Sequence, residues 1–321
     1  NFVAAGIQEL LKTNDFSTIG NVRLEIVARA HSSQPSADIQ YNPQFIAAVA
    51  KSLEKAFADA AKISDIDRQA KITLNLIILL DNLDNVQLAN LALKMIDSED
   101  AAVRYWAVHA ITNQKIIEQF NTGKAPAAVA RTITERLAAR INVETSPYII
   151  SQIVQFSAAV NIPQAQSLLM QTADMRLKKY QTWTVDNIPI DELTLRLLGE
   201  KATGPDKAAA ARRFAQLFSY AMEFYIKGRV GLDKAQKEQL ASVLVQTESR
   251  VLPKLLGAPQ AGIKKAVEKD TDQALMAEHK DLFGDGETRG KLGTALNIEY
   301  QNADGTKRVT PLPLPEKPKT K

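Results

Sequence analysis

Helix-length stretches with apolar residues at steps of three and four follow one another through most of this chain. In residues 44–62, Phe45, Val49, Leu53 and Phe57 recur every fourth residue and place one apolar stripe along a helix. No strand pattern interrupts the first 180 residues, and the breaks between helical stretches are short. Short connections make consecutive helices pack antiparallel, so the sequence predicts an all-α stack of helix pairs repeating every 33–50 residues.

Composition supports helix and removes several kinds of chemistry. The 321 residues include only 14 glycines and 13 prolines, while alanine and leucine, which cost least in a helix, are plentiful. Cysteine is absent, which excludes disulfides, thiol nucleophiles and cysteine metal sites. The three histidines, His31, His109 and His279, are far apart in sequence, and no apolar run reaches 18 residues. We therefore expect no metal, no cofactor and no transmembrane segment.

The stretch DSEDAAVRYWAVHAITN (97–113) carries the most specific pattern. Val103, Ala107, Ala110 and Ile111 fall on one face of a helix, and small alanines let neighbouring helices approach closely. Over residues 97–111 this stretch resembles the second helix of a HEAT repeat. The resemblance to HEAT and armadillo proteins implies an α-solenoid that scaffolds protein–protein contacts. It is clean only here, and we extend it to 1–182 as HEAT-like repeats.

In the resembled family, an arginine at the position of Arg104 pairs with turn aspartates, which here are Asp97 and Asp100. A structural ion pair is therefore expected, with an anionic ligand as the alternative. We expect Trp106 to be buried between repeats. No serine or aspartate lies at a spacing that would make His109 a catalytic base. Tyr105 and His109 are instead candidates for contact with a partner.

The region 183–283 is less regular and is expected to continue the solenoid. Its first part, 183–206, is interrupted by Pro189, Gly199 and Gly204, and is the place where an enzyme site would lie. The aromatic stripe in 214–229 is predicted to be core. Just before this region, basic and aromatic side chains gather as candidates for a partner or nucleic-acid contact: Arg176, Lys178, Lys179, Tyr180 and Trp183. A helix end, whose dipole favours cations, explains the same basic residues.

The end of the chain, 284–321, changes character. Residues 284–293 are glycine-rich but lack the lysine of a phosphate loop, and 294–310 predict a small hairpin around Asp304 and Gly305. The segment 311–321 (PLPLPEKPKTK) predicts extended polyproline-like chain with no core of its own. We expect 294–321 to lie along a partner or along the parent domain.

Charge favours neither nucleic acid nor a strongly acidic partner. Residues 1–160 carry 15 basic and 16 acidic side chains, net −1, and residues 161–321 carry 25 and 20, net +5. A dedicated nucleic-acid binder concentrates more positive charge on one face. Nucleic-acid binding by the basic second half is therefore the third hypothesis.

The sequence favours a non-catalytic helical-repeat scaffold, a subunit of a larger assembly with protein partners. The alternative is an enzyme or enzyme accessory with its site in 183–206. The missing cysteines favour an exported bacterial protein over a cytoplasmic one. The first residue, Asn1, is consistent with either a cleaved export signal or an artificial boundary.

Overall fold

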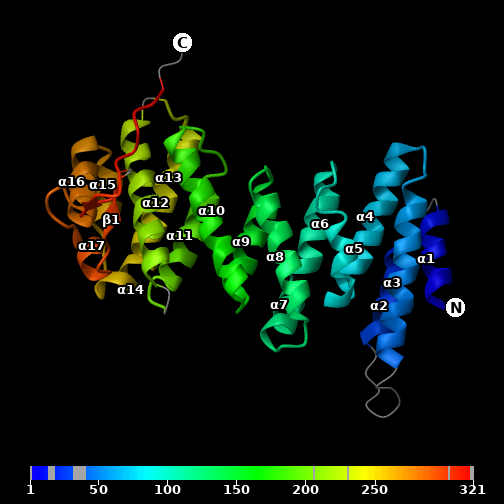
Figure 1. Cartoon of the computed structure of the whole chain (residues 1–321). Coiled ribbons are helices and arrows are strands. Elements are labelled where there is room, and N and C mark those ends of the chain that lie inside the picture. The colour runs from blue at the N-terminus through cyan, green and yellow to red at the C-terminus, as the bar shows by residue number, and fades with distance from the viewer. Residues whose placement is uncertain are drawn as a thin grey trace. The chain divides into compact units, whose positions relative to one another are not determined.

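The computed structural model describes residues 2–13, 19–31, 41–204, 207–229, 231–302 and 304–318 (Figure 1). Most of these residues are helical, with two short strands near the end. Within these ranges every helix is too short or too polar to cross a lipid bilayer. The all-α class predicted from the sequence is confirmed. The chain divides into two compact units, unit 1 (Asn1–Ala165) and unit 2 (Gln166–Lys321).

Unit 1 is a series of helices joined by short turns. Its elements are α1 (Phe2–Lys12), α2 (Ile19–His31), α3 (Tyr41–Ala60), α4 (Ile66–Asn82), the 3₁₀ turn η1 (Val86–Leu88), α5 (Ala89–Leu93), α6 (Ala101–Thr112), α7 (Gln114–Asn121), α8 (Ala127–Ile141) and α9 (Pro147–Ala159). Between α4 and α6 the chain does not form one long helix. The chain turns at Asp84, whose φ is +48°, and restarts as η1 and the short helix α5.

Helices of unit 1 pack on their sequence neighbours and on helices two or three places further along the chain. α1 packs against α3, α4 against α6, and α6 against α9, while α5 contacts α6 and α8. The predicted inward face of α6 is confirmed, because Val103, Ala107, Ala110 and Ile111 are all buried. Alanine at two of these positions leaves room for α4 and α9 to approach α6.

Unit 2 has longer central helices and a short irregular end. Its elements are α10 (Pro163–Gln181), whose first turn contains the unit boundary, α11 (Pro189–Lys201), α12 (Lys207–Lys227), α13 (Lys234–Arg250), α14 (Leu252–Leu256), α15 (Gly262–Lys269), α16 (Asp272–Phe283), α17 (Lys291–Ala295), β1 (Tyr300–Gln301) and β2 (Lys307–Arg308). α12 packs against α11, α13 and α16, and the predicted aromatic core of 214–229 lies on it.

The boundary between the two units does not coincide with the boundary expected at residue 182, between the HEAT-like repeats and the less regular region. The expected boundary falls in the loop between α10 and α11. Most of α10 belongs to unit 2, where Arg176 on α10 and Asp191 on α11 form a buried ion pair across the loop.

Two of the residues expected to interrupt 183–206, Pro189 and Gly199, lie within the helix α11. Pro189 occupies the first turn of α11, where its missing N–H leaves no donor unsatisfied. Gly199 lies inside α11 and is buried. A Cβ at this position would lie 2.3 Å from Cγ1 of Val251, so glycine allows the backbone of α11 to approach that side chain.

The hairpin predicted around Asp304 and Gly305 is confirmed. β1 and β2 pair antiparallel, with Tyr300 opposite Arg308. Gly305 has a φ of +82°, the left-handed conformation that glycine adopts without strain, and lets the chain reverse between the strands.

Replacing Gly199 with alanine should reverse the usual effect of this substitution. Helix propensity alone would stabilise a mid-helix Gly→Ala variant by about 1 kcal/mol, but the new methyl group would collide with Val251. We expect Gly199→Ala to destabilise the protein by about 1–3 kcal/mol in urea unfolding. The matched control is Gly20→Ala on α2, where an added Cβ meets nothing within 4 Å and should be neutral or stabilising. An equal gain in both variants would contradict the close approach.

Candidate functional site

Arg104 forms its ion pair with a different acid from the two that the resemblance implies. Its Nε lies 3.1 Å from Oε2 of Glu144, and its Nη2 lies 3.3 Å from Oε1 of the same carboxylate. Its Nη1 donates to two carbonyl oxygens in the turn that precedes α6, each at 2.8 Å. The expected ion pair of Arg104 with Asp97 or Asp100 is therefore wrong.

Both aspartates are engaged elsewhere. Asp100 is the N-cap of α6, and its Oδ1 accepts from the N–H groups of Ala102 and Val103 at 2.7 and 3.3 Å. An N-cap carboxylate faces the first turn of its own helix, so Asp100 turns away from Arg104. Asp97 instead accepts from Nη2 of Arg136 on α8 at 2.6 Å.

Glu144 is the centre of this network. Its side chain has no exposed surface, and it also accepts from Nε of Arg140 at 2.8 Å and from the backbone N–H groups of Thr145 and Ser146, both at 2.9 Å. Burial alone would raise the pKa of Glu144, but hydrogen bonds from the two arginines and two N–H groups lower it below its usual value. Five N–H donors on one carboxylate leave no room for a ligand, so the network is structural.

Arg176 and Tyr180 are buried and cannot meet a partner. Arg176 donates from Nε and Nη2 to the two oxygens of Asp191 at 2.6 and 2.9 Å, and Tyr180 donates its hydroxyl proton to the same carboxylate at 2.7 Å. All three side chains have no exposed surface. Burial raises the pKa of the Tyr180 hydroxyl well above its usual value, and the nearby Asp191 charge adds to this. Their assignment as residues that bind a partner protein is wrong. Both side chains are buried, and both bind Asp191 on the next helix.

The other residues of that cluster lie nearer the surface. Lys178 is exposed, so its contact with a partner stays a prediction. Lys179 is half-buried and forms an ion pair with Asp186. The ring of Trp183 lies 4.9 Å from that of Phe224, centroid to centroid, and its Nε1 donates to the carbonyl oxygen of Pro315 at 2.9 Å. Trp183 thus holds a segment of its own chain.

Carboxylates do converge at the start of 183–206, but they are not open to a substrate. Asp191 is fully buried against Arg176, and Asp186 lies 3.3 Å from Nη1 of the same arginine. Salt bridges from Arg176 and Lys179 lower the pKa of Asp186 even though partial burial opposes this. Both carboxylates are bound to Arg176, and the buried Asp191 is out of reach of a substrate, so the geometry does not favour an acid–base site here.

The segment that Trp183 holds runs along α12 of unit 2 (Figure 1). The side-chain amide of Gln216 exchanges two hydrogen bonds with the backbone of Leu312, both 2.8 Å long. Glu223 accepts from the N–H of Leu314 at 3.1 Å, and the side chain of Leu314 is buried. Of the two alternatives for the tail, residues 312–315 therefore follow the second and lie along the parent chain.

His279 on α16 makes a cluster that sequence spacing did not predict. Its Nε2 lies 2.8 Å from Oγ of Ser219 and 3.8 Å from Oε1 of Glu223, both on α12. A catalytic triad needs the acid at the other ring nitrogen, and Ser219 is only 1% exposed. Burial lowers the pKa of His279, which favours the neutral ring. The cluster joins α12 to α16 and does not form a nucleophile.

No group of metal-ligating side chains assembles within the described ranges. On α6, Nδ1 of His109 donates to Oδ1 of the buried Asp81 at 2.7 Å. The ring stacks on Tyr105 at 6.2 Å and meets the edge of Trp106 at 5.5 Å. Trp106 is half-buried, so its expected full burial is wrong: the side chain packs along its own helix. Contact of Tyr105 or His109 with a partner stays a prediction.

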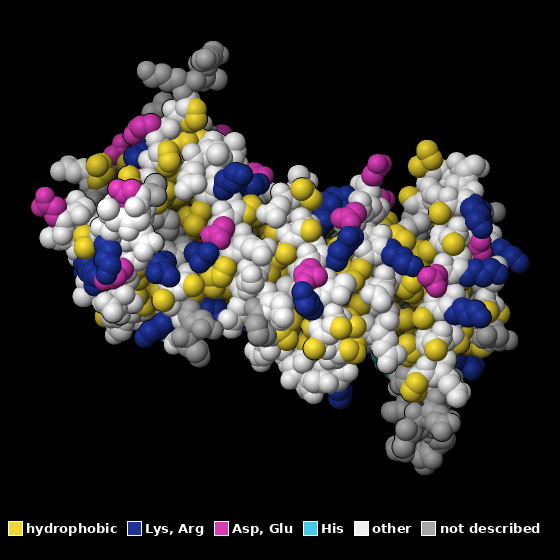
Figure 2. Space-filling model, viewed as in Figure 1, with side chains coloured by type: hydrophobic (Ala, Val, Ile, Leu, Met, Phe, Trp, Pro, Cys, Tyr) yellow, Lys and Arg dark blue, Asp and Glu magenta, His cyan; other side chains and the backbone are white. Residues whose placement is uncertain are grey.

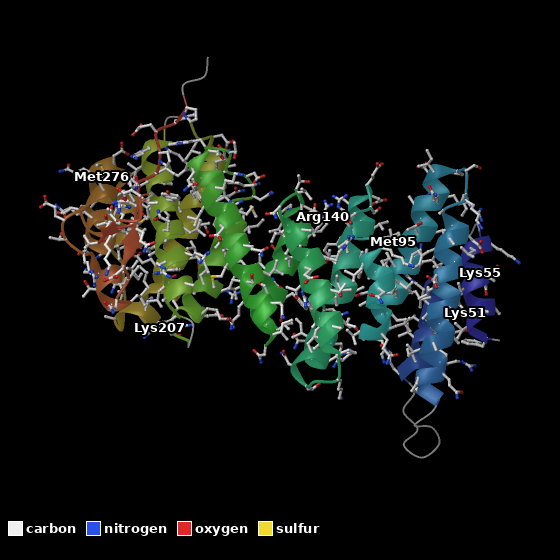
Figure 3. The ribbon with its side chains drawn as sticks, viewed as in Figure 1. Lys51, Lys55, Met95, Arg140, Lys207 and Met276 are labelled. Carbon is white, nitrogen blue, oxygen red and sulfur yellow. The ribbon has the colours of Figure 1, made fainter. Side chains whose placement is uncertain are left out.

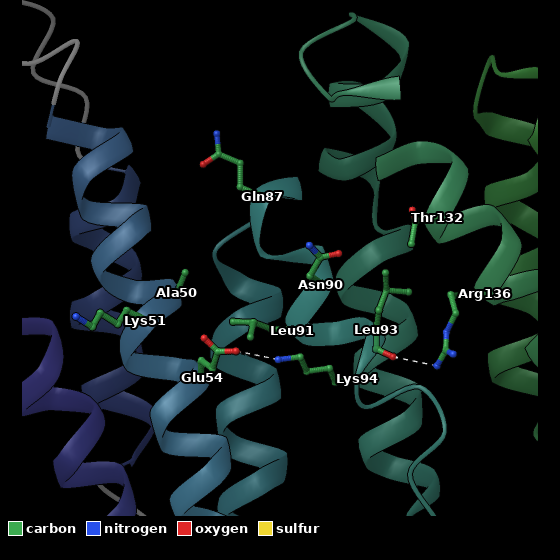
Figure 4. A pocket seen from close by; sticks show the side chains of 10 residues that line it. All are labelled: Ala50, Lys51, Glu54, Gln87, Asn90, Leu91, Leu93, Lys94, Thr132 and Arg136. Atoms are coloured by element: carbon green, nitrogen blue, oxygen red, sulfur yellow. Dashed lines mark hydrogen bonds and ion pairs between the residues drawn. The ribbon is translucent and has the colours of Figure 1, made fainter. Parts of the chain in front are cut away.

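The clearest uncovered hollow in unit 1 is the α3–α5–α8 groove, of about 770 Å³ (Figure 4). Leu91 and Leu93 supply its apolar part. Its rim carries side chains from α3, η1, α5 and α8, namely Lys51, Glu54, Gln87, Asn90, Lys94, Thr132 and Arg136. Glu54 and Lys94 form an ion pair of 2.9 Å across it. Figure 2 shows basic and acidic side chains interspersed over this face.

No protein-family model matches the chain, and no curated protein matches it. Its function must therefore be inferred from its own surfaces.

The His109–Asp81 contact predicts a pH dependence of stability. The hydrogen bond to Asp81 raises the pKa of His109 above 6.5, although partial burial opposes the shift. A raised pKa in the folded state stabilises fully below about pH 6.5, and this contribution is lost as pH rises through the folded pKa. We expect His109→Gln to destabilise the protein more at pH 6 than at pH 8.5 in urea unfolding. His31→Gln, at an exposed position on α2, is the control. An equal effect of His109→Gln at both pH values would contradict the assignment.

Proposed function

We propose that the chain is a non-catalytic α-solenoid of the HEAT/armadillo type that scaffolds protein–protein contacts as a subunit of a larger assembly. In this proposal the α3–α5–α8 groove of unit 1 receives a segment of the partner. The single observation that carries it is the groove itself: a continuous hollow made by three helices that no described residue fills.

The packing within unit 1 supports the solenoid. Contacts of α4 with α6 and of α6 with α9 form one row of helices, and the contact of α5 with α8 belongs to a second row. Two rows of helices that each contact the next member are what stacked helix pairs produce. The link from Arg104 on α6 to Glu144, next to α9, joins successive pairs, as the resembled family's arginine joins adjacent repeats.

The chemistry of the groove fits a peptide segment. Leucine side chains offer an apolar floor for one or two side chains of a partner. The amides of Gln87 and Asn90 and the hydroxyl of Thr132 offer donors and acceptors for its backbone. Such a mixture of apolar core and polar rim is typical of protein interfaces.

An enzyme site in 183–206 has less support. The carboxylates that converge there are held by Arg176, and Trp183 at its start is engaged with Pro315. Nucleic-acid binding likewise gains no support from the mixed charges of Figure 2.

The proposal is tested by isolating complexes of the full chain from its native source and identifying the protein that co-purifies. Its affinity is then measured for two variants. Asn90→Trp places an indole in the groove at an exposed position. Gln155→Trp makes a comparable change at an exposed position of α9 that does not line the groove. We expect at least roughly tenfold weaker binding for Asn90→Trp and none of that loss for Gln155→Trp.

A chain that is purified alone from its native source would contradict the scaffold role. A partner that binds Asn90→Trp as tightly as the unaltered chain would leave the scaffold role standing but contradict the assignment of the groove.

A further inference from the structure

Unit 2 contains a second hollow, of about 860 Å³, between α12, α16 and the segment that follows the hairpin. We propose that this pocket, called here the α12–α16 pocket, binds a small amphiphile with an apolar body and a single anionic group, such as a carboxylate. The inference is independent of the proposed scaffold role, because it concerns different helices and a different kind of ligand.

The walls of the pocket are suited to an apolar body. Ile226 comes from α12, Met276 and Phe283 come from α16, and Pro311 and Pro313 come from the C-terminal segment. Met276 is 59% exposed, although methionine is a residue that usually lies inside (Figure 3). A flexible thioether side chain at the mouth of a hollow adapts to apolar ligands of different shape. The volume is within the range of small-molecule sites.

The C-terminal segment completes the pocket. Its backbone N–H groups donate to Gln216 and Glu223 of α12, which sets Pro311 and Pro313 along one side of the hollow. The pocket is therefore built from parts of the chain nearly 90 residues apart in sequence and depends on the tail that α12 holds.

One of the four Lys and Arg side chains that line the pocket differs from the other three. Each of the other cations on its wall has a carboxylate beside it. Lys227 lies 2.9 Å from Glu223, Arg229 lies 2.8 Å from Asp272, and Lys280 lies 3.1 Å from Asp285. Arg229 also pairs with Asp270, and Lys227 lies 4.0 Å from Glu316, so these three cations are already engaged by carboxylates of the chain.

Arg308 is the exception. Its Nε donates to the carbonyl oxygen of Thr310 at 2.8 Å, its Nη2 to the hydroxyl of Thr310 at 3.1 Å, and its Nη1 to the amide oxygen of Asn302 at 3.2 Å. All three acceptors are neutral, and among the described residues no carboxylate forms an ion pair with this guanidinium. Guanidinium has five N–H donors, so one remains on each terminal nitrogen. A carboxylate can accept hydrogen bonds from both of these terminal nitrogens.

The arrangement selects for one negative charge. Arg308 is half-buried, so its attraction to an anion is screened less than that of an exposed arginine. A ligand with two or more charges would meet Glu223, Asp272 and Asp285 on the same walls. An apolar molecule without a charge would fill the hollow but leave the two donors of Arg308 unused.

The test compares octanoate with 1-octanol, two probes of equal chain length that differ in charge, by titration calorimetry on the full chain. We expect octanoate to bind roughly tenfold more tightly than octanol, as a hydrogen-bonded charge pair contributes. Arg308→Gln should weaken octanoate to the level of octanol and leave octanol unchanged, which shows that the pocket is intact. Arg308→Lys, which keeps the charge, should retain a preference for octanoate.

The matched control is Lys207→Gln, which removes one positive charge from the far end of α12, 16 residues or more from the pocket residues on that helix (Figure 3). It should leave both probes unaffected. The inference is overturned if neither probe binds, if octanol binds as tightly as octanoate, or if Lys207→Gln and Arg308→Gln have equal effects. Loss of both probes in Arg308→Gln together with loss of the preference in Arg308→Lys would also overturn it.

Discussion

The carboxylate of Glu144 is the interaction on which the arrangement of unit 1 depends. It lies just before α9, receives Arg104 from α6 and Arg140 from α8, and binds two backbone N–H groups of its own turn. A buried carboxylate without these donors would cost several kcal/mol, so it holds its helices only in the one register that satisfies it. Aliphatic packing alone tolerates small shifts between helices, because it has no direction. The buried salt bridges of Glu144 therefore fix the relative positions of helices that apolar packing alone would allow to shift.

Unit 2 uses the same device at other joints between helices. Asp191 at the start of α11 binds Arg176 and Tyr180 of α10, all without exposed surface. The buried carboxylate of Glu248 on α13 accepts from the first N–H groups of α15, those of Ile263 and Lys264, at 2.7 and 2.8 Å. These buried polar groups are engaged at contacts between helices, so the binding of other molecules is left to the hollows at the surface. The α3–α5–α8 groove offers a polar rim to a chain, and the α12–α16 pocket offers one unmatched guanidinium to a small anion.

Sequence reasoning succeeds here where a property repeats locally and fails where it depends on a distant partner. The apolar face of Val103 and Ala107 follows from helical periodicity, and the turn at Gly305 follows from residue type, so both are confirmed. Arg104 lies 40 residues from Glu144, so nothing local in the sequence indicates that pair. The position of Asp100 directly before the helix is, by contrast, a sequence signal for an N-cap that could have shown it to be engaged by its own helix. The residues around Arg176 have the composition of a surface cluster. Arg176 itself is buried because it forms an ion pair with Asp191. The role of Arg308 could not be predicted from the sequence, because only the folded chain shows which cations have no carboxylate partner.

The most direct test of this account is a double-mutant cycle between Arg104 and Glu144, measured by urea unfolding. Arg104→Gln, Glu144→Gln and the double variant would be compared with the unaltered chain. If the buried pair joins α6 to the start of α9, each single variant leaves an uncompensated group, and the two effects should be non-additive by more than about 1 kcal/mol. Single effects that add within about 0.5 kcal/mol would contradict the claim that this carboxylate holds successive helices together.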